Sequence, residues 1–287
     1  HSVSGRALLA DKDGSLYIGQ GYSIFRSVDG GENWELVTAL PRSPLRRISE
    51  PFQLACRLLR HEVRSLAKLS GNAYIAASRQ GLFFGFGGDS GMRCARIHAT
   101  GRVPAPPMQI EIGSDETILW GEYSSQRANE QVGIFASEDK GQNYELVYEF
   151  PSFSVRHIHN IRLDRLRQHY WILTGDYGDE PGIGMLSRDF RRFEWLVRGA
   201  QRFRAVDVFD LGESLLFATD TDREPNRFVK IDKNTGAYEE FGKLPGSCIP
   251  ASRIGSSYII STTVDPSTVN RSKMATLWIS IDGHHWC

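Results

Sequence analysis

The chain has 287 residues, and its 34 lysine and arginine residues balance 34 aspartate and glutamate residues, so its formal net charge at pH 7 is zero. This balance gives no electrostatic reason to expect nucleic acid or an anionic membrane as a partner, and we expect neither. No apolar run approaches the roughly 20 residues that a membrane-spanning helix needs, which predicts that the chain has no membrane span.

A short motif, Ser-x-Asp-x-Gly-x-x-Trp, recurs along the chain and predicts a series of tight turns. Its aspartate can accept backbone N–H bonds, its glycines tolerate positive φ, and its aromatic residue starts the next strand. The four copies, some of them imperfect, are Ser27–Trp34, Ser137–Tyr144, Ser187–Trp195 and Ser280–Trp286. Their aspartates lie about 50 residues apart or about twice that, and weaker turns at Gly87–Gly91 and Asp232–Gly236 fill the gaps.

Each repeat also contains a short apolar strand that ends in small or polar residues, as in Leu16–Gln20 and Trp171–Asp176. One repeat therefore consists of strand, turn, strand, loop, strand, aspartate turn and strand, which is a blade of a β-propeller. We predict an all-β fold, a six-bladed β-propeller with four-stranded antiparallel blades, as a single domain over residues 1–287. The predicted blades cover Ala7–Leu40, Val63–Thr100, Met108–Phe150, Val155–Arg198, Phe203–Leu244 and Cys248–Trp286.

Pro41–His61 interrupts the β pattern and predicts a short helix inserted between the first two blades, at about residues 45–61. Ser49 suits the N-cap and Pro51 the first turn, and apolar residues then recur at helical spacing. The sixth blade stops before a fourth strand can form. We expect His1–Gly5 to complete that blade, or the chain to have been cut short, because an open edge is costly.

The four cysteines are scattered without C-x-x-C spacing, which argues against a zinc site built from them. One disulfide is conceivable, but we expect four free thiols, at Cys56, Cys94, Cys248 and Cys287. The compartment is left open, with a secreted or periplasmic location as one option, because the absence of a signal peptide in a chain that starts at His1 proves nothing.

Two histidines at the start of the fourth blade are the first candidate for a functional site. If the aspartate turns join third and fourth strands, the polar strand ends lie on the opposite face, where six blades converge on a central pocket. His157 and His159 share one face of a strand, being two residues apart, and Asp176 ends the neighbouring strand. The three could hold a metal ion or act as base and acid, or the histidines could be satisfied by backbone groups between blades. We assign no metal and leave the cofactor unknown.

Carboxylates and arginines on the same face are the other two candidates. Equivalent ends of second strands carry three acids that could serve glycoside hydrolysis or could be solvated loop residues, namely Glu122, Asp176 and Asp220. Starts of first strands carry three arginines, namely Arg64, Arg156 and Arg204. Their guanidinium groups suit the carboxylate of a uronic or sialic acid, and salt bridges to the acids explain them as well. Further polar residues of this face include Gln201, Glu180 and Arg223.

The recurrent turns resemble the Asp-box (BNR) repeats of sialidase-like propellers, and as a repeat architecture this resemblance covers the whole chain. It implies that the turn aspartates, such as Asp29, are structural and lie away from the active face. The Arg-Ile-Pro motif of true sialidases does not occur in this sequence. Arg156–Asn160, Thr174–Asp176 and Ala218–Asp222 look similar to segments of uncharacterised bacterial Asp-box proteins associated with polysaccharide loci, which implies a glycan context.

We therefore predict a carbohydrate-active propeller that acts on an acidic, uronate- or sialate-type polysaccharide, as glycoside hydrolase or polysaccharide lyase, through a central pocket. The predicted catalytic residues are His157, His159, Asp176, Glu122 and Tyr177. The predicted substrate-binding residues are Arg64, Arg156, Asn160, Arg204, Asp220 and Asp222. The alternative is a non-catalytic glycan-binding or scaffold propeller in polysaccharide biosynthesis or export, which would present aromatic platforms and few interacting titratable groups.

Overall fold

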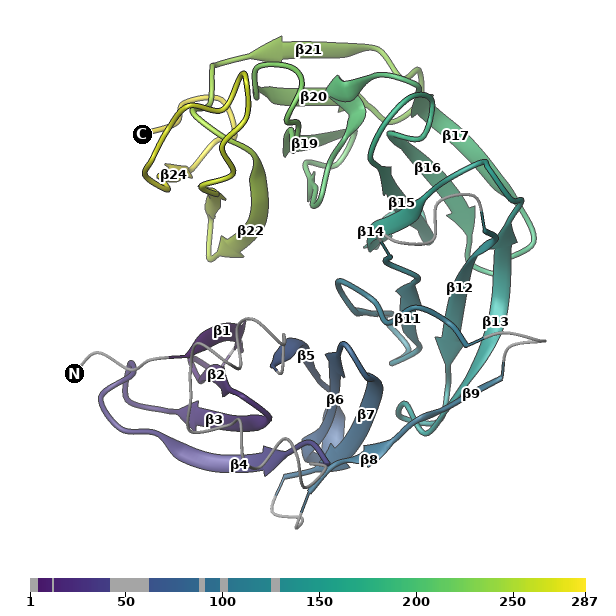
Figure 1. Ribbon diagram of the computed structural model, residues 1–287, viewed down its shortest axis with the longest axis vertical. Helices are drawn as coiled ribbons and strands as arrows, with labels where there is room; N and C mark the ends of the chain where they lie inside the picture. Colours follow the sequence, from purple (N-terminus) through teal and green to yellow (C-terminus); the bar gives the residue numbers. More distant parts are fainter. Residues whose placement is uncertain (1–4, 12, 42–61, 88–90, 99–102, 125–129) are drawn as a thin grey trace. The chain divides into compact units, whose positions relative to one another are not determined.

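A computed structural model of the chain describes residues 5–11, 13–41, 62–87, 91–98, 103–124 and 130–287. These residues form six sheets, most of them of four antiparallel strands, and the chain is a six-bladed β-propeller that is nearly all β (Figure 1). The predicted helical insertion at about 45–61 lies outside the described residues. In the described part of the chain, no helix has the length and apolar character needed to cross a membrane.

The described residues divide into two compact units, and the division runs through the third sheet. Unit 1 comprises residues 1–123 and 133–147, and unit 2 comprises residues 124–132 and 148–287. The first sheet has β1 (Arg6–Ala10), β2 (Leu16–Gln20), β3 (Ser23–Ser27) and β4 (Glu35–Ala39). The second has β5 (Val63–Lys68), β6 (Ala73–Ser78), β7 (Gly81–Phe86) and β8 (Arg93–Cys94), with the 3₁₀ turn η1 (Ser70–Asn72) after β5.

The third sheet differs from the prediction because it contains five strands. They are β10 (Glu111–Ile112), β11 (Ile118–Gly121), β12 (Val132–Ser137), β13 (Asn143–Phe150) and β9 (Arg96–His98). β9 follows the second blade in sequence but pairs in parallel with β13 of the third. β13 is a long outer strand, and β9 satisfies backbone groups that this edge would otherwise leave unpaired.

Unit 2 contains the last three sheets. The fourth has β14 (His157–Asp164), β15 (His169–Gly175), β16 (Gly182–Ser187) and β17 (Phe193–Arg198). The fifth has β18 (Phe209–Asp210), β19 (Ser214–Ala218), β20 (Phe228–Asp232) and β21 (Tyr238–Phe241), with the 3₁₀ turn η2 (Gln201–Phe203) before it. The sixth has β22 (Cys248–Ile254), β23 (Ser257–Thr262) and β24 (Leu277–Ser280), and Cys287 exchanges two backbone hydrogen bonds with Ile279 of β24.

The aspartate turns after β3, β12, β16 and β20 join third and fourth strands, as the repeat predicted. In the first turn, Asp29 accepts bonds from the Ser27 hydroxyl at 2.7 Å and from the Asn33 N–H at 2.9 Å. Asp139 repeats this pattern between β12 and β13, and Asp189 lies between β16 and β17. The degenerate turn at Asp232 lies between β20 and β21 and also closes through its carboxylate. These carboxylates are used in holding local turns.

Packing between neighbouring blades of unit 2 supports the strands that carry the candidate site. Trp171 and Leu173 of β15 are buried with Ile183 of β16, and they share one cluster with Phe203 and Phe217 of the fifth blade. The fourth and fifth blades are therefore held against each other by a continuous apolar core. Groups that project from these two blades can form a rigid site.

Candidate functional site

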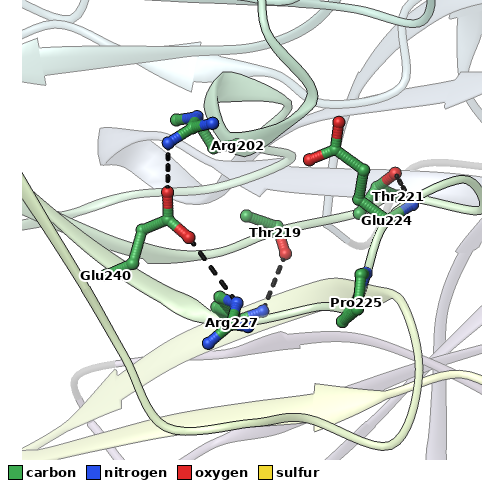
Figure 2. A pocket seen from close by; sticks show the side chains of 7 residues that line it. All are labelled: Arg202, Thr219, Thr221, Glu224, Pro225, Arg227 and Glu240. Carbon is green, nitrogen blue, oxygen red and sulfur yellow. Dashed lines mark hydrogen bonds and ion pairs between the residues drawn. The ribbon is translucent and has the colours of Figure 1, made fainter.

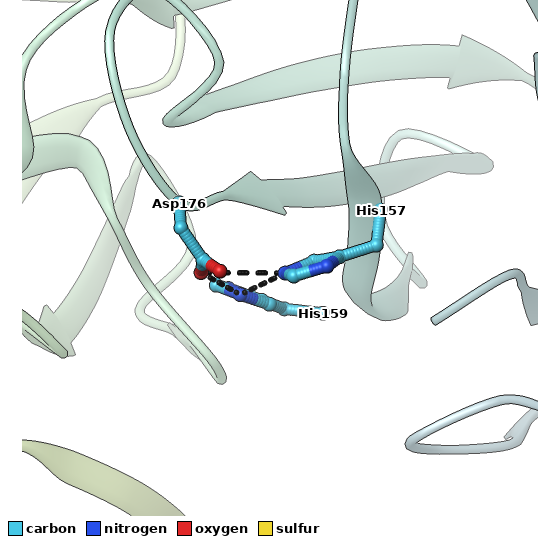
Figure 3. A group of neighbouring side chains, drawn as sticks. All are labelled: His157, His159 and Asp176. Carbon is cyan, nitrogen blue, oxygen red and sulfur yellow. Dashed lines mark hydrogen bonds and ion pairs between the residues drawn. The ribbon is translucent and has the colours of Figure 1, made fainter. Parts of the chain in front are cut away.

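Two histidines on β14 form the centre of the candidate site. The pairing of β14 with β15 shifts register between Ile158 and Asn160, which makes a β-bulge at His159. His157 and His159 are 1% and 2% exposed. Asp176 follows β15 directly, and its carboxylate points toward both imidazole rings (Figure 3).

The three side chains lie within hydrogen-bonding distance of one another. The two Nε2 atoms of His157 and His159 are 3.0 Å apart, and Asp176 Oδ1 lies 3.3 Å and 3.1 Å from them, respectively. Gly175 permits this packing, because a Cβ at that position would overlap the His159 ring. Burial alone would raise the pKa of Asp176, but protonation of the two imidazoles that face it outweighs burial and lowers the pKa well below its usual range.

The outer nitrogen of each imidazole is held by a backbone carbonyl. His157 Nδ1 lies 3.1 Å from the Ser124 oxygen, and His159 Nδ1 lies 2.9 Å from the Ala205 oxygen. A carbonyl oxygen can only accept, so both Nδ1 atoms carry a hydrogen. In the neutral rings, both Nε2 atoms then present a lone pair to the space they share with Asp176.

Arg204 connects this group to the carboxylates of the fifth blade. Its guanidinium lies 3.2 Å from Asp176, 3.6 Å from Asp220 and 3.1 Å from Asp222, and its side chain is 11% exposed. Burial would lower the pKa of Arg204, but the three carboxylates raise it. Burial raises the pKa of Asp220 by more than Arg204 lowers it. Within the described residues, the buried Arg204 Nε has no hydrogen-bond partner.

Three arginines lie around the aromatic ring of Tyr177. The guanidinium carbons of Arg156, Arg204 and Arg223 lie 5.5, 5.3 and 3.8 Å from the ring centroid, which is cation–π distance. The Tyr177 hydroxyl donates to Asp222 at 3.1 Å, and burial followed by this bond raises the pKa of Tyr177. Arg223 is exposed and, unlike the other two arginines, has no ion pair to any described residue.

Two further side chains hold the loop that carries Asp176 and Tyr177. Glu180 accepts the backbone N–H groups of both residues, at 3.2 and 3.4 Å, and also pairs with Arg156 at 3.3 Å. Gln201 donates to the Asp176 carbonyl at 2.7 Å. We refer to the whole set as the histidine–arginine site, which comprises His157, His159, Asp176, Tyr177, Arg204, Asp220, Asp222 and Arg223.

Three predicted site residues have other surroundings. Asn160 accepts the Ile161 N–H at 2.9 Å and donates to Asp207 at 3.3 Å, so it serves the backbone near the bulge. Glu122 is buried in unit 1, and its two oxygens accept backbone N–H groups at 2.7 Å each. Arg64 is half-buried on β5, also in unit 1. Their proposed roles remain predictions, as does the central pocket.

A separate polar cavity of about 200 Å³ lies in the fifth blade (Figure 2). Glu240 pairs there with Arg202 at 2.6 Å and with Arg227 at 3.6 Å, so both cations have an ion-pair partner. The cavity is lined by Arg202, Thr219, Thr221, Glu224, Pro225, Arg227 and Glu240. It contains no histidine or cluster of carboxylates, and the histidine–arginine site is the stronger candidate.

The comparisons with known proteins identify a fold. No family model matches the chain, and no curated protein matches it. It is similar over 99% of its length to the extracellular domain of a protein assigned as a one component system in B. thetaiotaomicron, with a TM-score of 0.64 and 12% identity. The chain spans only 36% of that protein's chain.

Two similar structures match over most of both chains. One is the calcium-binding protein regucalcin from Agrobacterium tumefaciens, with a TM-score of 0.59, 10% identity, and coverage of 94% of this chain and 83% of that one. The other is a gluconolactonase from Xanthomonas campestris, with a TM-score of 0.58, 9% identity, and coverage of 89% and 82%. At such identities, the likeness shows the fold alone.

Proposed function

We propose that the histidine–arginine site binds an acidic saccharide through its carboxylate and cleaves it by β-elimination, as a polysaccharide lyase. The observation that carries this proposal is Arg223, an exposed guanidinium without an ion pair to any described residue, stacked on Tyr177, the residue that follows Asp176. Such a group is ready to form a bidentate bond with a carboxylate. The resemblance of the turns to Asp-box propellers supports a glycan ligand. So does the gluconolactonase of similar fold, which is described as important in glucose secondary metabolic pathways.

Elimination at a uronate needs a cation against the carboxylate and a base for the C5 proton. Arg223 can neutralise the carboxylate, which makes the C5 proton more acidic. The base removes that proton, the electron pair forms the C4–C5 double bond, the C4–oxygen bond breaks, and the leaving oxygen takes up a proton from the protonated base or from water. The candidates for the base are the Nε2 atoms of His157 and His159, which carry lone pairs, and the hydroxyl of Tyr177.

Hydrolysis is the second candidate, and one geometric feature favours it. Asp176 and Asp220 both lie against the same Arg204 nitrogen, at 3.2 and 3.6 Å, so two carboxylates from different blades are close to one another. Glycoside hydrolysis uses such a pair as acid and base or nucleophile. A binder without activity would use the same arginines and leave the histidines without a catalytic role.

The test is to incubate the full chain with acidic and neutral polysaccharides while following ultraviolet absorbance and reducing ends. Unsaturated product with new reducing ends supports the lyase, and reducing ends alone overturn it in favour of hydrolysis. Binding without either product overturns the enzyme and supports the glycan-binding alternative. His159→Ala and Asp176→Ala should each abolish turnover, whereas unchanged turnover in both removes these residues from the site.

Arg223→Ala tests the role of this arginine at the substrate carboxylate. Loss of a charge-assisted hydrogen bond costs about 1.5–3 kcal/mol, so kcat/KM for the acidic saccharide should fall by roughly 10- to 100-fold. Both a higher KM and a lower kcat contribute, because Arg223 would bind the carboxylate and also neutralise it during elimination. The matched control is Arg253→Ala, which removes an exposed arginine that also stacks on a tyrosine, Tyr258, at 5.2 Å. Equal effects of the two substitutions would contradict the assignment.

A further inference from the structure

We propose that His157 Nε2, His159 Nε2 and Asp176 Oδ1 bind a divalent transition-metal ion. This inference concerns the same site as the proposed function but stands without any saccharide. Among the described residues, these three form the group whose ligand atoms all lie within 4.8 Å of one another. Hydrogen bonds to Nδ1 fix the orientation of both imidazole rings.

The two rings are held with their lone pairs facing each other. The Nδ1 atoms of His157 and His159 donate to the carbonyl oxygens of Ser124 and Ala205, so in the neutral rings the lone pairs are on the Nε2 atoms. Those two buried acceptors are 3.0 Å apart, with the Asp176 carboxylate as a third acceptor beside them. Acceptors in contact repel one another, and the Arg204 guanidinium, 3.2 Å from Asp176 Oδ1, offsets the charge of the carboxylate only. A cation bound to all three atoms would remove the repulsion.

A single shared proton satisfies this arrangement only in part. A proton on one Nε2 can be directed at the other ring or at Asp176, and one of the three contacts then remains between two acceptors. A divalent ion accepts a lone pair from all three atoms at once. Backbone carbonyls that orient ligating imidazoles through Nδ1 are the usual second shell of such sites, and both histidines have one.

The spacing of the three atoms matches a facial set of ligands. The sides of the triangle are 3.0, 3.1 and 3.3 Å. Ligands about 2.1 Å from an ion and at right angles to one another are about 3.0 Å apart, and tetrahedral ligands are about 3.4 Å apart. Two histidines and one carboxylate on one face leave the remaining coordination positions open for water or substrate.

The ligand set also selects the kind of ion. Calcium and magnesium prefer six or more oxygen ligands, whereas imidazole nitrogens suit zinc, iron and their first-row neighbours. Ligation would occupy both Nε2 lone pairs, and Tyr177 would then be the remaining candidate for the base. The ion would also lie where it can share the neutralisation of a substrate carboxylate with Arg223.

The experiment measures metal binding directly and needs no saccharide. The full chain is stripped with a chelator and titrated by calorimetry with Zn²⁺, Mn²⁺ and Ca²⁺, with metal content checked by mass spectrometry. We expect one equivalent of Zn²⁺ or Mn²⁺ to bind and to raise the melting temperature, and Ca²⁺ not to bind at this site. Absence of stoichiometric binding of Zn²⁺ and Mn²⁺ by the folded, stripped chain would overturn the proposal.

Three variants locate the site. Asp176→Asn and His159→Gln should each weaken binding by about 100-fold or more, because loss of an outer-shell partner alone costs about 10- to 100-fold. The matched control is His285→Gln, which removes an exposed histidine bonded to Asp282 at 2.7 Å and should leave binding unchanged. Circular dichroism identifies variants that fold, and a folded His159→Gln or Asp176→Asn chain with undiminished binding would contradict the assignment.

Discussion

Lys233→Met should strongly destabilise unit 2, because Lys233 is a fully buried cation between the fourth and fifth blades. Its ammonium group lies 2.7 Å from Asp164 Oδ2 and 2.5 Å from Asp210 Oδ1, and the side chains of Lys233 and Asp164 are both 0% exposed. Methionine keeps the length of the stem but leaves Asp164 without its cation. Breaking a buried pair in this way costs about 3–5 kcal/mol.

The lower end of that range is expected, because Asp164 keeps its bonds from the Arg167 N–H at 2.9 Å and the Trp171 indole at 3.2 Å. A loss of about 3 kcal/mol in the free energy of unfolding corresponds to a fall in Tm of roughly 6–12 °C. Urea unfolding at pH 7, followed by tryptophan fluorescence, measures the loss. Adding Asp164→Asn should restore most of it, since no unpaired charge is then buried.

The same pair predicts a dependence on pH. Burial would raise the pKa of Asp164, but the bonds from Lys233 and the backbone outweigh it and lower the pKa below 3.8. The contribution of a carboxylate with a lowered pKa is present above pH 3.8 and is lost as the pH falls through its folded-state value. The difference in the free energy of unfolding between wild type and Lys233→Met should therefore decrease at acidic pH. A loss below about 1 kcal/mol at pH 7, or a gap that persists in acid, would refute the reasoning.

Two other predictions concern a turn and a thiol. Gly141→Ala should lower the Tm more than Gly31→Ala does. Both glycines have positive φ, which costs an alanine about 1–2 kcal/mol. Only a Cβ at Gly141 would overlap Ile75, which adds about 1–3 kcal/mol. Equal losses would contradict this packing. Burial, followed by the charge of Asp220, raises the pKa of the Cys248 thiol to about 12. Cys248 should therefore resist alkylation by iodoacetamide in the folded chain at pH 8, whereas the exposed Cys94 should react. Peptide mass spectrometry checks this, and equal labelling would refute it.

Much of the fold could be predicted because the repeated turn is a local structure. The Ser27–Asp29 pattern specifies its own hydrogen bonds, so its recurrence marks the third strand of a blade wherever it occurs. Strand β9 could not be predicted in this way. Arg96–His98 carries no motif, and its parallel pairing with β13 depends on an open edge that only the folded sheet presents.

The candidate site likewise combines residues whose positions follow from the local sequence with backbone groups from distant parts of the chain. His157, His159 and Asp176 could be predicted to meet, because alternation along one strand and the end of its neighbour bring them together. The carbonyls of Ser124 and Ala205 could not be predicted, since every residue carries a carbonyl and the sequence does not mark these two. They nevertheless decide which nitrogen of each imidazole faces the site.

Glu122 shows the limit of the argument from position. It follows its strand as Asp176 and Asp220 follow theirs, and the sequence grouped the three as acids that could serve glycoside hydrolysis. In the structure its oxygens accept the N–H groups of Ala105 and Gly133, so the carboxylate closes a gap in the backbone hydrogen bonding of unit 1, and its catalytic role stays a prediction. Equivalent positions in a repeat therefore specify where the backbone of a residue lies, whereas the hydrogen-bond partners of its side chain depend on the neighbouring loops.

The contacts of β14 suggest why a site could be built at this strand. Asp164, at one end of β14, forms an ion pair with Lys233 of the fifth blade. Arg162 donates two hydrogen bonds to Asp207 of the same blade, at 2.7 and 2.6 Å. His159, near the other end, is tied to the same blade through the Ala205 carbonyl at 2.9 Å. These three polar contacts along β14, above an apolar core, hold the His159 imidazole in a single orientation before a ligand binds. A preorganised site does not spend binding energy on ordering its own side chains.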